Sequence, residues 1–337
     1  MAVQGPYLLF LGDTVERTLA KTACGVIDWA PDRCLGQLRL SEDTVSLGLP
    51  DLTPQAAAAA GARTLVVGIA NVGGRWDERW RDVFRVALES GLDIAAGMHE
   101  RLNADPELSS IAMAQGRRLI DLRDPPSDLP IGNGKPRSGR RILTVGTDCA
   151  VGKKYAALSI WQALQDLGAD ASFCATGQTG VLISGRGFAI DSVVADFISG
   201  AAERLSPSAD PSHIDVIEGQ GSLFHPAYAG VSLGLLHGAQ PEAIILCHEP
   251  GRDEIAHFEG YALPSLDEAI TRHLEMGRLT SPSLYCAGIS LNTSKLDEAS
   301  ADRVLRETAQ SLELPVIDPM RTGGRAIAEA FVEKTAS

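Results

Sequence analysis

The sequence predicts an α/β protein of two domains, each built around a mostly parallel sheet. Its 337 residues exceed the roughly 100–200 residues of one typical domain. Short apolar runs alternate with helix-length segments, which is typical of βα units whose parallel sheet is covered on both faces. A glycine-rich stretch at 146–153 stands where a strand must turn into a helix. Because ligands of such folds bind at the carboxyl ends of the strands, we expect the site there.

Residues 1–124 carry the elements of a small Rossmann-like domain. Thr53 and Pro54 combine an N-cap residue with a first-turn proline, which predicts an alanine-rich helix that ends at Gly61. A second helix is expected from Trp80 to Ser90, before Gly91. The apolar runs that we interpret as strands lie at 7–11, 64–70, 92–96 and 119–122.

Residues 125–141 are predicted to link the two domains. The stretch holds four prolines and three glycines, together with a basic cluster of Lys135, Arg137, Arg140 and Arg141. This composition is typical of an exposed, flexible connection. We therefore place a linker at 125–141 and the second domain at 142–337.

From residue 142 the alternation of strands and helices is regular. Strands are predicted at 142–146, 171–175, 214–217, 243–247, 284–289 and 315–317. Helices are predicted at 152–167, 190–204, 228–236, 265–276 and 297–312, with a last helix from about 323. Repeated βα units with short loops predict a mostly parallel sheet.

The net charge and the cysteine pattern limit the expected binding partners and the expected cellular compartment. Acidic residues outnumber basic ones by 13, so nucleic acid and anionic membranes are poor partners. The six cysteines form no CxxC pair, and no apolar stretch reaches the roughly 20 residues that a membrane helix needs. We expect a cytoplasmic protein with reduced thiols that acts on a small molecule, and a homo-oligomer is left open.

The strongest motif is a phosphate-binding loop that opens the second domain. Glycines let main-chain N–H groups curl around a phosphate, the helix N-terminus favours negative charge, and the lysine can reach the terminal phosphate. We expect that lysine to be reachable by solvent in the empty site. The residues are Gly146, Thr147, Asp148, Cys149, Ala150, Val151, Gly152 and Lys153. One extra residue separates the glycines compared with the common P-loop pattern, and this variant resembles the loop of dethiobiotin synthetase.

The residue after the P-loop lysine argues against Mg-ATP as the expected ligand. Nucleotide hydrolases have Ser or Thr there to hold Mg²⁺, but this chain has Lys154, a cation that repels the metal. We therefore expect no metal, and we expect the loop, with both Lys153 and Lys154, to anchor a phosphorylated carrier such as coenzyme A. Mg-ATP is expected only if the protein is a ligase or kinase.

Two further polar loops follow neighbouring strands. They contain Thr176-Gly177-Gln178-Thr179-Gly180 and Glu218-Gly219-Gln220-Gly221-Ser222-Leu223. Because both open on the same sheet edge as the P-loop, we expect a shared site in which Thr176, Gln178 and Gln220 bind the substrate. Arg186 and Arg252 are candidates to bind a substrate carboxylate, against the alternative of exposed turn arginines.

These motifs, with His225-Pro226 and Leu291-Asn292-Thr293-Ser294, resemble the family once catalogued only as a domain of unknown function and now associated with D-glutamate N-acetyltransferase. The resemblance implies a Rossmann-like domain followed by a P-loop domain. It also implies acetyl transfer from acetyl-CoA to the amino group of a D-amino acid, with D-glutamate favoured, in D-amino-acid catabolism. By analogy with related P-loop proteins, Asn292 would contact the adenine ring.

Acetyl transfer to an amine needs a base, because the amine must lose a proton before it attacks the thioester. The candidates are Glu218, His225 and His248. Glu218 and His248 are placed at predicted strand ends, and His225 lies seven residues after Glu218, before Pro226, where its side chain could return to the site. A nucleophilic role for Cys149 is a less simple alternative. An ATP-dependent ligase or kinase like dethiobiotin synthetase, and a nucleotide- or CoA-sensing protein, are the competing functions.

Overall fold

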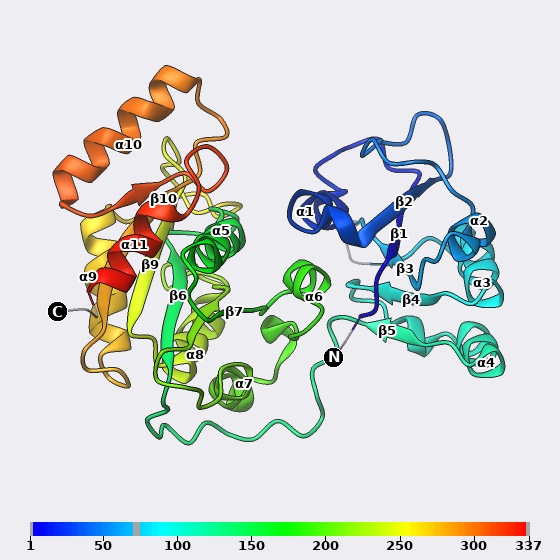
Figure 1. The fold of residues 1–337 in the computed structure, drawn as a ribbon, viewed down its shortest axis with the longest axis horizontal. Coiled ribbons are helices and arrows are strands. Elements are labelled where there is room, and N and C mark those ends of the chain that lie inside the picture. The colour runs from blue at the N-terminus through cyan, green and yellow to red at the C-terminus, as the bar shows by residue number, and fades with distance from the viewer. Residues whose placement is uncertain (1–2, 70–74, 335–337) are drawn as a thin grey trace. The chain divides into compact units, whose positions relative to one another are not determined.

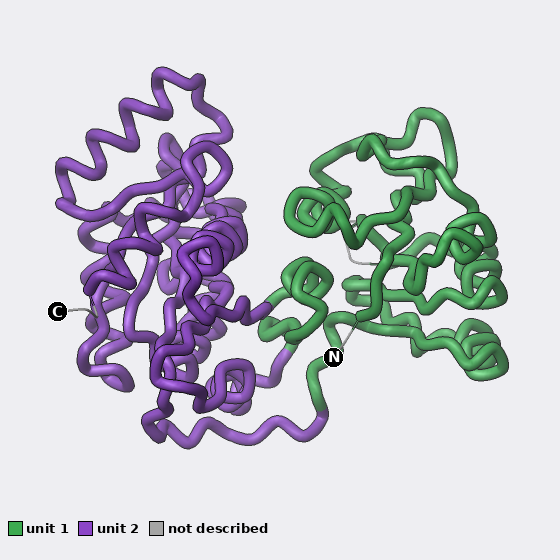
Figure 2. Tube along the Cα trace, in the orientation of Figure 1, with its two compact units in different colours: residues 1–126, 177–192 green, residues 127–176, 193–337 purple. Residues whose placement is uncertain are grey.

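The computed structural model describes residues 3–69 and 75–334, which form two compact units (Figures 1 and 2). Unit 1 comprises residues up to Pro126 together with Gly177–Ser192, and unit 2 comprises Ser127–Thr176 and the chain from Val193 onward. Each unit contains one sheet, and every strand pair in the two described sheets is parallel. The predicted α/β class is confirmed.

The sheet of unit 1 has the strand order β2-β1-β3-β4-β5. Its strands are Tyr7–Gly12 (β1), Cys34–Arg39 (β2), Thr64–Val67 (β3), Asp93–Ala96 (β4) and Leu119–Asp121 (β5). Its helices are Lys21–Trp29 (α1), Pro54–Ala59 (α2), Arg81–Glu89 (α3), Pro106–Gln115 (α4) and Gln178–Ser184 (α6). Helices α1 and α6 lie on one side of this sheet and α2, α3 and α4 on the other (Figure 1).

The local signals in this half predict several of these elements. The Thr53 hydroxyl accepts from the Ala56 main-chain N–H at 3.2 Å, which confirms the predicted N-cap of α2. Strand β3 ends at Val67, earlier than predicted, and Ala70, the last residue of the predicted strand, lies outside the described residues. Helices α1 and α4 and strand β2 were not predicted.

Helix α6 connects a distant part of the sequence to unit 1. The Tyr7 hydroxyl donates to the Leu182 carbonyl at 2.9 Å, and Arg33 Nη1 donates to the Ile183 carbonyl at 3.0 Å. The predicted helix at 190–204 is wrong over its first half, since the α-helix α7 spans only Ile198–Leu205 and short 3₁₀ turns precede it. These anchors place the segment after β7 with unit 1.

The sheet of unit 2 has the strand order β11-β10-β9-β6-β8-β7. Its strands are Arg140–Gly146 (β6), Ala171–Cys174 (β7), Ile214–Ile217 (β8), Ala243–His248 (β9), Tyr285–Leu291 (β10) and Val316–Ile317 (β11). Besides α7, its helices are Lys153–Asp166 (α5), Ala229–Ala239 (α8), Leu266–Gly277 (α9), Glu298–Leu312 (α10) and Arg325–Glu333 (α11). Helix α5 packs on α11, and α7 packs on α8.

The predicted linker is held against unit 2 by its basic side chains. Strand β6 begins at Arg140, and Arg141 is only 4% exposed, with its Nε donating to the Ser206 hydroxyl at 2.7 Å. Arg137 donates to the main-chain carbonyls of Ser206 and Gly238, both at 2.5 Å. Arg137 and Arg141 therefore differ from the expected exposed connection, because their guanidinium groups find carbonyl acceptors, whereas Lys135 and much of the rest of this stretch are exposed.

Strand β6 is central in this sheet and positions the site. It pairs with β8 on one side and β9 on the other. Because all of these strands run parallel, their following loops converge on one edge of the sheet, with the loop after β6 in the middle. Within the described residues, no helix combines the length and apolar composition that a membrane span requires.

Candidate functional site

The loop after β6 has the backbone of an anion-binding loop. Ala150 and Gly152 adopt left-handed conformations, with φ values of 56° and 99°. A Cβ added to Gly146 would lie 2.8 Å from the Val151 side chain, so only glycine fits there. Within the described residues no side chain caps the N-terminus of α5. The first N–H groups of a helix have no intrahelical acceptor, so this end of α5 can bind an anion.

Lys153 lies beneath this loop rather than in solvent. Lys153 is only 7% exposed, and its Nζ donates to the Asp148 carbonyl at 2.7 Å. The expectation that solvent reaches it is wrong, because the lysine folds back onto the main chain of the loop. Burial lowers the pKa of Lys153. A phosphate bound at this loop would favour the charged form of Lys153.

Replacing Lys153 with Met tests this anchoring. We expect acetyl-CoA to bind about 1.5–3 kcal/mol more weakly, which is the scale of one charge-assisted hydrogen bond. The free energy of unfolding should be retained, because Met removes a buried ammonium group whose charged form the fold disfavours. Titration calorimetry measures the first effect and urea denaturation the second. The comparison variant is Lys154→Met, which removes the other lysine of the loop, whose Nζ lies 5.0 Å from the Tyr155 ring centre, and leaves Lys153 in place. An unchanged dissociation constant in Lys153→Met would contradict the anchoring role.

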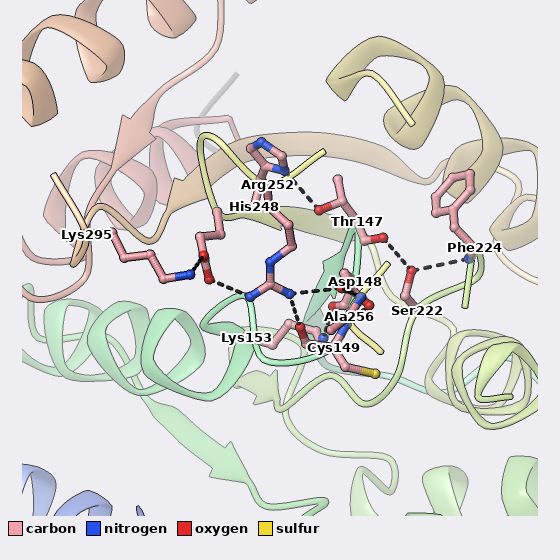
Figure 3. Close-up of polar contacts among 11 residues, drawn as sticks. Thr147, Asp148, Cys149, Lys153, Ser222, Phe224, His248, Arg252, Ala256 and Lys295 are labelled. Carbon is pink, nitrogen blue, oxygen red and sulfur yellow. Dashed lines mark hydrogen bonds and ion pairs between the residues drawn. The ribbon is translucent and has the colours of Figure 1, made fainter. Parts of the chain in front are cut away.

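The Asp148 side chain connects the P-loop to the loop after β9 by hydrogen bonds (Figure 3). Its carboxylate is fully buried and accepts from Arg252 Nη1 at 2.9 Å and from the Ala256 N–H at 2.8 Å. Arg252 Nη1 also donates to the Cys149 carbonyl at 2.9 Å. These contacts occupy the guanidinium that we expect to bind a substrate carboxylate, and that role stays a prediction.

Glu249 completes this ionic network. Its carboxylate accepts from Arg252 Nη2 and from Lys295 Nζ, both at 2.5 Å. Burial opposes ionisation of Glu249, but the Lys295 hydrogen bond and the Arg252 charge outweigh it and hold its pKa below the usual value. Glu249 is therefore an ionised acceptor for two cations.

Glu218, Thr176 and Gln220 meet at the ends of β7 and β8. Glu218 is only 4% exposed, and its Oε2 accepts from the Thr176 N–H at 3.0 Å. The Thr176 hydroxyl donates to the Glu218 carbonyl at 2.7 Å and accepts from Gln220 Nε2 at 3.1 Å. A Cβ on Gly219 would lie 1.7 Å from the Thr144 carbonyl, so glycine is required for this close approach. These contacts bring three predicted site residues together.

His248 ends β9 beside the first half of the P-loop. Its Nδ1 lies 3.0 Å from the Thr147 hydroxyl, and the Thr147 carbonyl accepts from the Ser222 hydroxyl at 3.0 Å (Figure 3). Burial, aided by the charge of Arg252, lowers the pKa of His248 below its usual value near 6.5. The ring is therefore neutral at physiological pH, as a proton acceptor must be.

His225 is held in one orientation by its own loop. It is 2% exposed, and its Nδ1 accepts from the Ala227 N–H at 3.1 Å. In the neutral ring this acceptor role leaves the proton on Nε2, so that nitrogen is a donor. The fixed tautomer suits a hydrogen bond to a developing negative charge better than proton abstraction.

Among the described residues, one group of three could supply ligands to a metal ion. Ligand atoms of Asp148, Cys149 and His225 lie within 4.8 Å of one another. Both carboxylate oxygens of Asp148 already accept from protein donors, including Arg252 and the Cys149 N–H. Burial raises the pKa of the Cys149 thiol, which opposes the thiolate that a metal or a nucleophilic mechanism needs. The donor set is thus a poor fit for a cation.

A pocket of about 270 Å³ adjoins the second half of the P-loop. Its lining includes Val151, Gly152 and Tyr155 as well as Asn292. The end of β10 and the loops after β10 and β11 supply the other lining residues, namely Ser290, Ser294, Asp318, Pro319, Met320 and Arg321. Its volume and its place beside the P-loop fit a ring attached to a phosphate.

Gln178 and Arg186 belong to unit 1, whereas the P-loop belongs to unit 2. Gln178 is the first residue of α6, and its side chain packs against Gly97, where an added Cβ would collide with it. Arg186 is exposed in the turn after α6. Substrate binding by these two residues stays a prediction.

Sequence reasoning missed several residues of the site. Lys295 and the Asp148–Arg252 pair form contacts between positions far apart in the chain, which no local pattern predicts. Asp318 follows the short strand β11, and its Oδ2 accepts from the Thr293 N–H at 3.1 Å. Its place after a strand was the available signal, since the other strand-end loops were recognised by that rule.

Fold and site define a two-domain α/β protein with a P-loop whose backbone suits an anion and which lacks the usual Ser or Thr metal ligand after its lysine. Comparison with known families matches the P-loop domain of DUF1611, a domain of unknown function, over residues 130–328, and the Rossmann-like N-terminal domain of DUF1611 over residues 38–125. The chain belongs to this family.

Similar proteins cover almost the whole chain. A D-glutamate N-acetyltransferase from Tritonibacter scottomollicae is 45% identical over 98% of this chain and 99% of its own length. Another of the same name, from a Pseudoalteromonas species, is 44% identical over 96% of this chain and 97% of its own length. The crystal structure of a DUF1611 family protein from Anabaena variabilis is 29% identical and covers 98% of this chain and 100% of that one, with a TM-score of 0.86.

Proposed function

We propose that this protein is a D-glutamate N-acetyltransferase that moves an acetyl group from acetyl-CoA to the amino group of D-glutamate. The observation that carries the proposal is the 45% identity to an enzyme of that name across both units. The match covers 98% of this chain and 99% of the relative, so it extends over both units. Acetyl transfer to a D-amino acid is also what the resemblance of the motifs to this family implies.

The anion-binding loop and its neighbouring pocket support acetyl-CoA as the donor. The N–H groups at the start of α5 and the Lys153 ammonium would bind the diphosphate, and the pocket at Asn292 would hold the adenosine. Lys154 replaces the hydroxyl residue that Mg-ATP chemistry uses. In this proposal the phosphates serve as anchors and not as leaving groups.

Among the three candidate bases we propose His248. Glu218 is buried and already accepts from Thr176, and the His225 tautomer presents a donor at Nε2. His248 is neutral, and when Nδ1 donates to the Thr147 hydroxyl the Nε2 lone pair is left to take a proton. His248 would remove the ammonium proton of D-glutamate, and the amine nitrogen would then attack the thioester carbonyl. As the tetrahedral intermediate collapses, the C–S bond would break, the nitrogen would lose its second proton, and the departing CoA thiolate would take up a proton and leave as the thiol.

The negative charge that develops on the carbonyl oxygen needs hydrogen-bond donors. His225 Nε2 is our candidate, because its ring is held by Ala227 and lies beside Cys149. Thr176 and Gln220 would orient D-glutamate at the neighbouring strand ends. Gln178, Arg186 and Arg252 remain candidate ligands for its carboxylates, and the proposal contains no metal ion.

Two measurements test the proposed function. Titration calorimetry compares acetyl-CoA with Mg-ATP, and a thiol-release assay follows acetyl transfer to D-glutamate, with L-glutamate as the matched control. We expect acetyl-CoA to bind without Mg²⁺ and CoA thiol to appear only with an amino-acid acceptor, faster with the D-isomer. Mg-dependent ATP binding without any response to acetyl-CoA would instead support a ligase or kinase. CoA binding without turnover would support a sensor.

A further inference from the structure

Four aromatic rings from two loops of unit 2 pack in a row. Tyr228 stacks on His225 with ring centres 4.4 Å apart, and Phe258 meets His225 nearly edge-on at 4.8 Å. Phe258 in turn meets the Tyr261 ring at 6.2 Å. We call His225, Tyr228, Phe258 and Tyr261 the aromatic wall.

The two outer rings of the aromatic wall are open to solvent although its centre is buried. Tyr228 is 52% exposed and Tyr261 53%, whereas His225 is 2% exposed. Adjacent exposed tyrosines beside a binding loop offer both an apolar face and hydroxyl groups to a ligand. These exposed faces are therefore available to a ligand bound beside the P-loop.

The aromatic wall is attached to the first half of the P-loop. The Ala256 N–H donates to Asp148, and the Ile255 N–H donates to the Tyr261 carbonyl at 2.8 Å, which closes the loop that carries Phe258. A ring nitrogen of His225 lies within 4.8 Å of Cys149 Sγ. The pocket at Asn292, in contrast, adjoins Val151 and Gly152 in the second half of the P-loop.

A ligand bound to the P-loop would therefore have the aromatic wall beside the first half of the loop and the pocket at Asn292 beside the second half. With adenosine in the pocket and diphosphate over the N-terminus of α5, the rest of the donor leaves the loop at the Cys149 half. There the pantoyl group, which follows the diphosphate directly, has two methyl groups and a secondary amide. Methyl groups pack on aromatic faces and the amide can hydrogen-bond to a tyrosine hydroxyl.

We propose that the aromatic wall binds the pantetheine arm of the acyl donor and turns it back toward His248. This inference rests on the proposed function. The arm is about as long as four residues of extended chain and would span up to ~14 Å if straight. Its thioester would then lie well beyond His248, which contacts the P-loop through Thr147. A folded arm removes this mismatch.

The test compares ligands with and without the arm by titration calorimetry on the full-length protein. The variant is Tyr228→Ala/Tyr261→Ala, and the matched control is Tyr228→Phe/Tyr261→Phe, which keeps both rings. We expect the alanine variant to bind CoA roughly 10-fold more weakly, from the loss of two aromatic contacts. Binding of ADP, which has the diphosphate but no arm, should change less than about twofold on the same scale. The phenylalanine variant should keep most of the CoA affinity.

Several outcomes would overturn the proposal. Unchanged CoA affinity in the alanine variant would show that the pantetheine arm does not contact the aromatic wall. An equal loss for CoA and ADP would indicate damage to the P-loop instead. Dissociation of an oligomer with CoA binding retained would make the aromatic wall a protein interface. Failure of the proposed function looks different, since the wild-type protein would then bind ADP but not CoA.

Discussion

Replacing His248 with Gln is expected to lower kcat by roughly 10²–10⁴-fold, the usual contribution of a general base. Glutamine keeps a polar side chain near the Thr147 hydroxyl but cannot take up the ammonium proton of D-glutamate. Acetyl-CoA affinity should therefore stay close to that of the wild-type protein. Steady-state kinetics at saturating D-glutamate and acetyl-CoA give kcat, and calorimetry gives the affinity.

The comparison variants are Glu218→Gln and His225→Gln. Glu218→Gln should leave kcat almost intact and act on stability, because Glu218 serves as an acceptor for the Thr176 N–H. His225→Gln should reduce kcat less than the His248 change, since glutamine can still donate a hydrogen bond. A collapse of kcat in Glu218→Gln with His248→Gln fully active would transfer the base role to Glu218.

The pH dependence gives a second test of His248. Burial, with the Arg252 charge, holds its pKa below the usual value, and the ring must be neutral to accept a proton. Activity should therefore persist to a pH below 6.5 and fall as pH drops through the lowered pKa of His248. Titration of the substrate amine raises the rate with pH in every variant. Only a separate low-pH limb in kcat/KM that disappears in His248→Gln supports the assignment.

Asp148→Ala should destabilise unit 2 by about 3–5 kcal/mol, the cost of leaving one partner of a buried ion pair alone. The change removes the acceptor of Arg252 and of the Ala256 and Cys149 N–H groups. Hydrogen exchange of peptides from α5 and from residues 253–263 measures the loss within unit 2 alone. Peptides from the sheet of unit 1 are the internal reference.

Asp148→Asn is the matched variant for this prediction. It keeps one oxygen that can accept from a main-chain N–H but has no charge to pair with Arg252. We expect an intermediate loss of about 1–3 kcal/mol, the cost of a weakened buried hydrogen bond. Unchanged protection of α5 in Asp148→Ala would show that Arg252 finds enough acceptors in Glu249 and the Cys149 carbonyl.

Local patterns predict the regular elements of unit 2 well. Strand β8 matches the predicted residues 214–217, and α5 begins within one residue of the predicted start. Both elements are predicted by local sequence, because an apolar run of four residues indicates a strand and a glycine-rich turn indicates the start of the helix that follows it. The P-loop was recognised for the same reason.

Contacts between distant residues account for what the sequence did not predict. Arg141 was predicted to be part of an exposed linker, yet two of its acceptors, Ser206 and Pro207, lie about 65 residues later in the chain. Lys153 was expected in solvent, but the turn of the loop directs its ammonium onto the Asp148 carbonyl. Helix α6 was missed because its packing partners, Tyr7 and Arg33, lie near the N-terminus. Burial and pairing of this kind depend on the finished fold.

The membership of α6 in unit 1 has a consequence for the order in which the chain folds during synthesis. Domains often fold as units while the ribosome still extends the chain. Unit 1 lacks the partners of Tyr7 and Arg33 until residues 177–192 have emerged. By then β6, α5 and β7 of unit 2 have already left the ribosome. During synthesis, the sheet of unit 1 therefore lacks helix α6 on its α1 side while the first elements of unit 2 begin to form.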